Sequence, residues 1–238
     1  MAAYRRVLLK VSGESFRGED GVPVSADAAL GLAREIAGAA DEGAGIGVVV
    51  GGGNVIRGIA VGRSGRDRVA SDYMGMLATV LNGAALREAF LSLGRDAVLF
   101  SATPCEAIAE RYDPFLARKR LDEGAIAIFA GGTGNPLLST DTAAALRAVE
   151  IGADVLLKAT KVDGVYDSDP MIDADARRFD SLSYLEVISQ KLEIMDLTAV
   201  SVCREHGLAI VVFALAEPGN TARAVRGESV GTIIKGGE

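Results

Sequence analysis

The sequence is poor in the residue types on which several common kinds of site depend. Its 238 residues include no tryptophan, two cysteines and a single histidine. Cys105 and Cys203 lie far apart and lack the spacing of metal ligands, so we expect reduced thiols in a cytoplasmic protein. His206 falls near the expected end of a helix, where we interpret it as a C-terminal cap. Ser-His-Asp catalysis and histidine-bound metals are therefore excluded.

Basic residues and long apolar runs are also scarce. The chain has 25 Lys and Arg against 32 Asp and Glu, a net charge of −7, which argues against general binding of nucleic acid or anionic membranes. No apolar run reaches the roughly 18 residues of a membrane span, and MAAYRRVLLKVSGES lacks the pattern of a signal peptide. Apolar residues make up 49% and charged residues 24%, as in an ordinary folded protein.

Strand and helix signals alternate along the chain. Apolar runs predict strands, and periodic apolar stripes predict helices. The expected strands are 6–11, 46–50, 97–100, 125–130, 154–157, 209–213 and 231–234, and the expected helices are 25–42, 69–92, 112–122, 141–151, 184–190, 196–206 and 220–226. We also expect a small hairpin within 12–24, a helix starting near 51–54 and a hairpin turn at Asp163-Gly164.

This order predicts an α/β protein, a three-layer αβα sandwich with a mostly parallel central sheet. We expect a single domain over residues 1–238. Its N-terminal lobe (about 1–152) and its C-terminal lobe (about 153–238) would share that one sheet.

Glycines, lysines and short polar residues follow four of the expected strands. These residues are Lys10, Ser12 and Gly13, then the glycines of 51–53 and 131–134, then Lys158, Thr160, Lys161 and Asp163. Because the carboxyl ends of parallel strands meet at one edge, they predict a cradle for phosphate-rich ligands there. Two simpler interpretations remain open. The segment 131–142 would be an ordinary surface connection, and Lys10 would reach solvent from the end of its strand.

The familiar phosphate-binding motifs are missing. The sequence has no GxxxxGK[ST], no HRD and DFG pair, and no GxGxxG. P-loop kinases, protein kinases and Rossmann dinucleotide-binding proteins are thereby excluded.

Five segments together resemble the bacterial uridylate kinases of the amino-acid-kinase fold. They are KVSGE (10–14), VVVGGGNVIRG (48–58), SDYMGMLATVLNG (71–83), AGGTGNPLLSTDTAA (130–144) and KATKVDGVYDSDP (158–170). The similarity covers essentially the whole chain. It implies transfer of the γ-phosphate of ATP to UMP in pyrimidine nucleotide biosynthesis, with UMP in the N-terminal lobe and ATP in the C-terminal lobe. It also implies Mg²⁺ bound mainly through ATP phosphates and water, with no metal ligands from the chain.

The resemblance further implies roles for individual residues. Lys10 would bridge the donor and acceptor phosphates, and Asp141 would orient the lysines and help to place Mg²⁺. Either Lys158 or Lys161 would face phosphate while the other caps the strand, and our choice is Lys161. The implied catalytic residues are Lys10, Arg57, Asp141 and Lys161. For ATP they are Lys10, Val11, Ser12, Gly13, Gly53, Arg57, Thr160, Tyr166 and Asp169. For UMP they are Gly52, Asp72, Thr133, Gly134, Asn135, Pro136, Leu137, Leu138, Ser139 and Thr140.

Assembly and regulation are implied in the same way. The family typically forms homohexamers, is inhibited by UTP and in many members is activated by GTP. Arg87 matches the GTP site of those members, but Leu91 and Val98 stand where they have basic or polar residues.

Two rival functions remain. One is storage or sensing of an anion, which needs no Lys10–Asp141 pair. The other is acyl-phosphate formation on a carboxylate or carbamate, by a kinase that would lack Asp72 and the TGNP loop.

Overall fold

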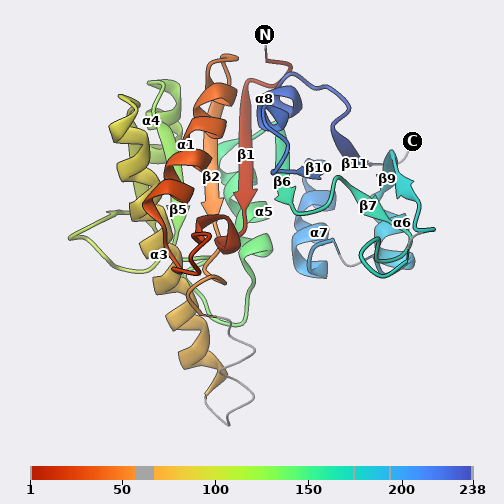
Figure 1. Cartoon of the computed structure of the whole chain (residues 1–238), viewed down its shortest axis with the longest axis horizontal. Helices are drawn as coiled ribbons and strands as arrows, with labels where there is room; N and C mark the ends of the chain where they lie inside the picture. The colour runs from red at the N-terminus through yellow and green to blue at the C-terminus, as the bar shows by residue number, and fades with distance from the viewer. Residues whose placement is uncertain (1, 57–66, 174, 193, 237–238) are drawn as a thin grey trace.

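A nine-stranded sheet runs through the molecule, with β1 between β2 and β6 (Figure 1). The structure is a computed structural model and describes residues 2–56, 67–173, 175–192 and 194–236. Every neighbouring pair of strands is parallel except β10 and β11. From edge to edge the strands are β4 (Glu110–Arg111), β3 (Ala97–Ser101), β5 (Ile126–Ala130), β2 (Gly45–Val50), β1 (Arg6–Val11), β6 (Val155–Thr160), β10 (Ala209–Ala214), β11 (Gly231–Lys235) and β9 (Ser181–Ser183). The predicted mostly parallel α/β sheet is confirmed.

Helices cover both faces of this sheet and complete the three layers. One apolar core joins the first face to α1 (Ala26–Ala40), α3 (Arg68–Ser92) and α8 (Asn220–Val225). A second core joins the other face to α4 (Pro114–Asp122), α5 (Thr140–Ile151), α6 (Tyr184–Ser189) and α7 (Leu197–Glu205). The amino-terminal part of α3 projects beyond the carboxyl ends of β1 and β2 (Figure 1). Across the described ranges, no helix is both long enough and apolar enough to span a membrane.

The alternation of side chains along β1 decides which face each residue serves. Val7, Leu9 and Val11 pack in the core under α1 and α3, whereas Leu8 packs in the core under α5. Because successive side chains of a strand point to opposite faces, Lys10 shares the α5 face with Leu8. The alternation that buries the apolar residues of β1 thus also places Lys10 near the start of α5.

Short polar side chains cap the starts of several helices. Ser25 caps α1, Ser139 caps α5 and Asp67 caps α3, each accepting a backbone N–H of the first turn. His206 is the C-terminal cap residue of α7, as predicted.

Three local predictions are wrong. Segment 12–24 holds no hairpin but a 3-10 helix (η1, Gly13–Phe16), because the Ser12 hydroxyl accepts the Glu14 N–H and closes a turn. Asp163-Gly164 does not join two paired strands, since β7 (Val165–Tyr166) pairs with the distant β8 (Arg178–Phe179) instead of β6. Finally, β6 does not end at residue 157 but runs to Thr160.

The extra length of β6 comes from its neighbour β10. Ala159 and Thr160 pair with Phe213 and Ala214, which continues the ladder past the end that the apolar run alone suggested. Residues 51–56, where a helix was expected to begin, form turns, and residues 57–66 lie outside the described ranges.

Candidate active site

Four adjacent strands bring the predicted site residues to one edge of the sheet. β5, β2, β1 and β6 are consecutive and parallel, so their carboxyl ends share an edge. The glycine turns 51–53 and 131–134 follow β2 and β5 there, beside Lys10 near the end of β1. This edge is where open α/β sheets bind ligands.

Two lysines and one aspartate form a compact ionic cluster at this edge. The Lys10 ammonium lies 2.9 Å from Asp141 Oδ1, and the Lys158 ammonium donates to Asp141 Oδ2 at 2.7 Å. Lys10 approaches Oδ1 outside hydrogen-bond geometry, so Oδ1 accepts no hydrogen bond from the described residues. The cluster carries one net positive charge and is largely buried, which suits it to an anionic ligand.

Burial and charge act against each other on the pKa values of this cluster. Burial by itself would raise the pKa of Asp141, but the charges of Lys10 and Lys158 outweigh it and hold that pKa below its usual value. Burial, followed by repulsion from Lys10, lowers the pKa of Lys158, although Asp141 opposes the shift. Asp141 therefore keeps two like charges close together in a poorly solvated position.

The structure brings Lys158, and not Lys161, to Asp141. Lys158 lies inside β6, in register with Lys10 of β1, so the two side chains point to the same face. Lys161 follows the strand and is exposed. β6 thus puts Lys158 on the α5 face beside Asp141, whereas Lys161, our choice for the catalytic lysine, lies beyond the strand.

The turns after β1 and β2 touch each other closely at Gly13. A Cβ at Gly13 would lie 2.5 Å from Asn54 Oδ1 and 2.7 Å from Gly53 N, so only glycine fits. Asn54 is held in turn by a reciprocal amide pair with the buried Asn82 of α3, at 2.9 and 2.8 Å. The glycine turn after β2 is thereby fixed between η1 and α3.

A cavity of about 440 Å³ lies between the glycine turns and α3. Five of the residues predicted to bind UMP line it, namely Gly52, Asp72, Leu138, Ser139 and Thr140. Gly53, predicted for ATP, also lines it, as does Gly132 of the predicted phosphate cradle. Met76 and Thr79 line it too, although no binding role was predicted for them. The other predicted UMP residues (Thr133, Gly134, Asn135, Pro136 and Leu137) belong to the same loop but not to the cavity wall.

Asp72 ties this loop to α3. Its Oδ2 accepts the Leu137 N–H at 2.8 Å, and both carboxylate oxygens accept the Arg68 side chain at 2.8 and 3.0 Å. Leu137 has a φ of 70°, an uncommon value for a residue with a side chain. Asp72, which is predicted to bind UMP, thus holds the loop across its cavity.

A second cavity, of about 630 Å³, opens beside β6. Thr160, Tyr166 and Asp169, all predicted for the nucleoside part of ATP, line it together with Lys158. Tyr166 is oriented by its hydroxyl, which donates to Asp163 at 2.5 Å. Since Thr140 lines the first cavity and Lys158 the second, the Lys10–Asp141–Lys158 cluster lies between them.

The remaining predicted residues have simpler positions. Val11 is buried in the core beneath α1 and α3, so only its backbone is available to a ligand. Ser12 caps η1, and Arg57 lies outside the described residues. Nowhere in the described ranges do three or more His, Cys, Asp or Glu side chains gather as a metal site.

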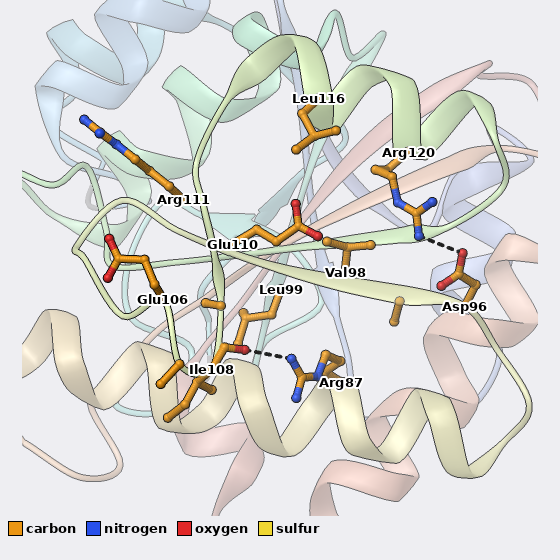
Figure 2. A pocket seen from close by; sticks show the side chains of 13 residues that line it. Arg87, Asp96, Val98, Leu99, Glu106, Ile108, Glu110, Arg111, Leu116 and Arg120 are labelled. Atoms are coloured by element: carbon orange, nitrogen blue, oxygen red, sulfur yellow. Dashed lines mark hydrogen bonds and ion pairs between the residues drawn. The ribbon is translucent and has the colours of Figure 1, made fainter.

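A third cavity lies away from the ionic cluster, beside β3 and the short edge strand β4 (Figure 2). It measures about 640 Å³ and contains three arginines, Arg87, Arg111 and Arg120. Arg87 donates to the Ile108 carbonyl at 2.7 Å, and Arg120 pairs with Asp96 at 3.0 Å (Figure 2). Val98 lines the same cavity. We call it the edge cavity. Its lining residues include none of Lys10, Asp141 and Lys158.

A parallel sheet with glycine turns and a net cationic cluster at its carboxyl edge defines a phosphate-binding α/β protein. The chain belongs to the amino acid kinase family, whose family model matches residues 5–214. A uridylate kinase of Xanthomonas oryzae pv. oryzae (strain KACC10331 / KXO85) is 47% identical over 234 residues, which cover 98% of each chain.

Solved structures agree with this assignment. The UMP kinase from Bacillus anthracis superposes with a TM-score of 0.94 at 36% identity, covering 98% of this chain and 96% of that one. The UMP kinase from Ureaplasma parvum gives 0.91 at 31% identity, covering 97% and 98%. The predicted resemblance to bacterial uridylate kinases is confirmed.

Proposed function

We propose that this protein is a UMP kinase, which transfers the γ-phosphate of ATP to UMP and yields UDP and ADP in pyrimidine nucleotide biosynthesis. The observation that carries the proposal is the Lys10–Asp141–Lys158 cluster between two cavities of nucleotide size. The relatives named uridylate kinase and UMP kinase support the same activity. We expect it to act in the cytoplasm, in keeping with the free thiols of Cys105 and Cys203.

ATP would bind beside β6 and UMP beside α3. The cavity with Thr160, Tyr166 and Asp169 suits the nucleoside of ATP, and its phosphates would extend toward Lys10, Ser12 and Gly13. The cavity with Asp72 and the 131–140 loop suits UMP. The two phosphate groups would then meet at the lysines.

Catalysis would consist of positioning and charge neutralisation. Both reacting phosphates are already anionic, so the acceptor needs no strong general base. Lys10 and Lys158 would neutralise the charge that the transferred group carries, and the amino-terminal end of α5 adds the positive end of a helix dipole. Asp141 would hold the two ammonium groups in place.

Mg²⁺ would be held mainly by ATP phosphates and water. Asp141 is the buried carboxylate in the cluster, and its two oxygens already face the ammonium groups of Lys10 and Lys158. The ion would supply further neutralisation of the phosphate charge. One carboxylate that is already paired with two lysines fits this arrangement better than a metal site built from protein ligands.

An acceptor panel tests the proposal. ADP release with ATP and Mg²⁺ should depend on UMP and be much slower with a glutamate-type acceptor, while CMP and dUMP measure how strictly the base and ribose are read. Activity with a carboxylate and none with UMP would favour an acyl-phosphate kinase. Nucleotide binding without turnover of any acceptor would favour an anion-storing or anion-sensing protein.

Regulation is a separate part of the proposal. UTP would inhibit by occupying the UMP cavity. GTP is the candidate activator, and the edge cavity with Arg87 offers cationic groups for it, although Val98 contributes no polar group there (Figure 2). Initial rates measured at increasing UTP and at increasing GTP test inhibition and activation separately. A rate that does not change with GTP would exclude GTP as an activator.

The homohexamer expected from the resemblance has one feature in its favour. Exposed apolar side chains recur every four residues along α3, at Val69, Tyr73, Leu77 and Leu81. Such a stripe would be covered by a second copy. Light scattering should report a smaller assembly for Leu77→Glu than for the wild type, while Leu185→Glu, on α6, serves as a matched exposed control.

A further inference from the structure

Arg147 is a buried arginine on α5 that is not part of the Lys10–Asp141–Lys158 cluster. Only 5% of it is exposed. Its guanidinium lies 3.8 Å from the centre of the Tyr112 ring, and Nη1 donates to Glu150 Oε2 at 2.5 Å. The remaining contact is to the backbone, where Nη2 donates to the Gly132 carbonyl at 3.3 Å.

The surroundings leave this guanidinium little freedom. A buried charge is costly unless it is paired and hydrogen-bonded, and Glu150 provides the pairing. The Tyr112 hydroxyl donates to the same Glu150 oxygen at 2.6 Å, which fixes the ring under the guanidinium. Arg147 is therefore held from two sides before it reaches Gly132.

Gly132 belongs to the loop that encloses the candidate UMP cavity. Gly131 and Gly132 have φ values of 75° and 59°, so the chain turns there through a conformation that favours glycine. Thr79 of α3 accepts the Gly131 N–H at 2.7 Å. Thr79 and Gly132 both line the cavity.

These contacts anchor the start of the loop from both faces of the sheet. Thr79 reaches it from α3 on one face, and Arg147 reaches it from α5 on the other. The Gly132 carbonyl and the Thr133 N–H form one peptide group. A cation bonded to that carbonyl strengthens the N–H as a donor, because hydrogen bonds through one group polarise each other.

We propose that Arg147 is a positioning residue for the acceptor nucleotide: through the Gly132 carbonyl it holds the 131–140 loop in the shape that receives UMP. The inference rests on the proposed function, since it takes UMP to be the occupant of this cavity. Tyr112 and Glu150 serve the same purpose by holding Arg147.

The test compares Arg147→Met with a matched buried arginine. Arg6 is also 5% exposed, pairs with Asp122 and donates to the Ile151 carbonyl at the far end of the same helix. Arg6→Met therefore removes a comparable buried contact away from the loop. For wild type, Arg147→Met, Arg147→Lys and Arg6→Met, kcat, KM for UMP, KM for ATP and Tm are measured.

We expect Arg147→Met to raise KM for UMP by about tenfold, the effect of losing one hydrogen bond to a charged group, with KM for ATP within about twofold of wild type. Arg147→Lys should recover part of the difference, because a lysine can still reach a carbonyl. Arg6→Met should lower Tm without raising KM for UMP relative to KM for ATP.

Equal rises in both KM values, or an Arg6→Met variant with the same selective rise, would overturn the inference. If Arg147→Met does not fold, Tyr112→Phe replaces it, since this change keeps the ring and removes only the bond to Glu150. A smaller rise in KM for UMP alone is then expected, and unchanged KM values would count against the inference. If the wild type shows no UMP-dependent ADP release, the proposed function itself is wrong. If the wild type is active but the variants change both KM values equally, only the inference about Arg147 is wrong.

Discussion

Lys10 and Lys158 are Cα partners across the ladder between β1 and β6, and both of their ammonium groups reach the carboxylate of Asp141. The two lysines lie close together because β1 and β6 are parallel and pair in this register. Residues opposite each other in a parallel ladder point to the same face, so two lysines at matching positions must share a partner or repel each other. Asp141, in the first turn of α5, supplies that partner.

Lys158 and Lys161 make the sharpest comparison in the site. Lys158→Met should lower kcat by about a hundredfold or more, the usual effect of removing one group that stabilises transition-state charge. Lys161→Met should stay within about twofold of wild type, because its side chain is exposed beyond the strand. Steady-state kinetics with UMP and ATP measure both, and a larger loss in Lys161→Met would remove Lys158 from the chemistry.

Asp141 should make stability depend on pH on the acid side. Burial would raise its pKa, but Lys10 and Lys158 lower it below its ordinary value of 3.8. A carboxyl whose pKa is lowered by folding stabilises the protein above its unfolded pKa, and this contribution is lost as the pH falls through the folded pKa. Urea unfolding between about pH 6 and about pH 3 should therefore show a steeper loss for wild type than for Asp141→Asn.

The same variant should be less stable near neutral pH. Asp141→Asn leaves two buried ammonium groups without their counter-charge, which costs about 3 kcal/mol of unfolding free energy. A variant as stable as wild type at neutral pH, with an equally steep acid limb, would contradict this account of the cluster.

Gly13 should not tolerate a methyl group. A Cβ there meets Asn54 and the backbone of Gly53 at 2.5 and 2.7 Å, so Gly13→Ala should lower the unfolding free energy by about 1–3 kcal/mol. Gly38→Ala is the matched control, because Gly38 lies within α1 with nothing near its Cβ position. That change should raise stability by about 0.5–1 kcal/mol. Chemical denaturation of both variants gives the comparison.

Substitutions of Asp72 and Asp169 should affect the binding of different nucleotides. Each lines a different cavity, so Asp72→Asn should weaken UMP binding and Asp169→Asn should weaken ATP binding. We expect a several-fold rise in one Kd and little change in the other, as for loss of a hydrogen bond to a charged group. Calorimetric titration with one nucleotide at a time measures this, and a crossed or equal effect would reassign the cavities.

The fold was predictable from sequence wherever one strand or helix carried its own signal. The apolar run of β1 gave its bounds of Arg6–Val11, and Ser25 marked the start of α1. The position of Lys158 was not predictable in this way. Whether it lies inside or after β6 depends on its pairing with Val212 of β10 and Lys10 of β1, both far away in the sequence.

The supporting residues of the site were harder to predict than its charged groups. Thr79 lies within a recognised motif, but its bond to Gly131 joins segments that only the folded sheet brings together. Arg147 interrupts the apolar sequence AAALRAV, which was an available signal for a buried charge with a special partner. Its partner, a loop carbonyl, has no sequence signature at all.

The central place of β1 bears on how this protein could be divided. β1 pairs with β2 on one side and with β6 on the other, although β6 begins only after residue 152. A fragment cut after residue 152, the expected border of two lobes, would leave β1 without β6 and expose unpaired backbone groups and apolar faces that promote aggregation. Neither half could be produced as an independent module for one nucleotide, and insertions or permutations that keep the protein intact must leave the β1–β6 seam closed.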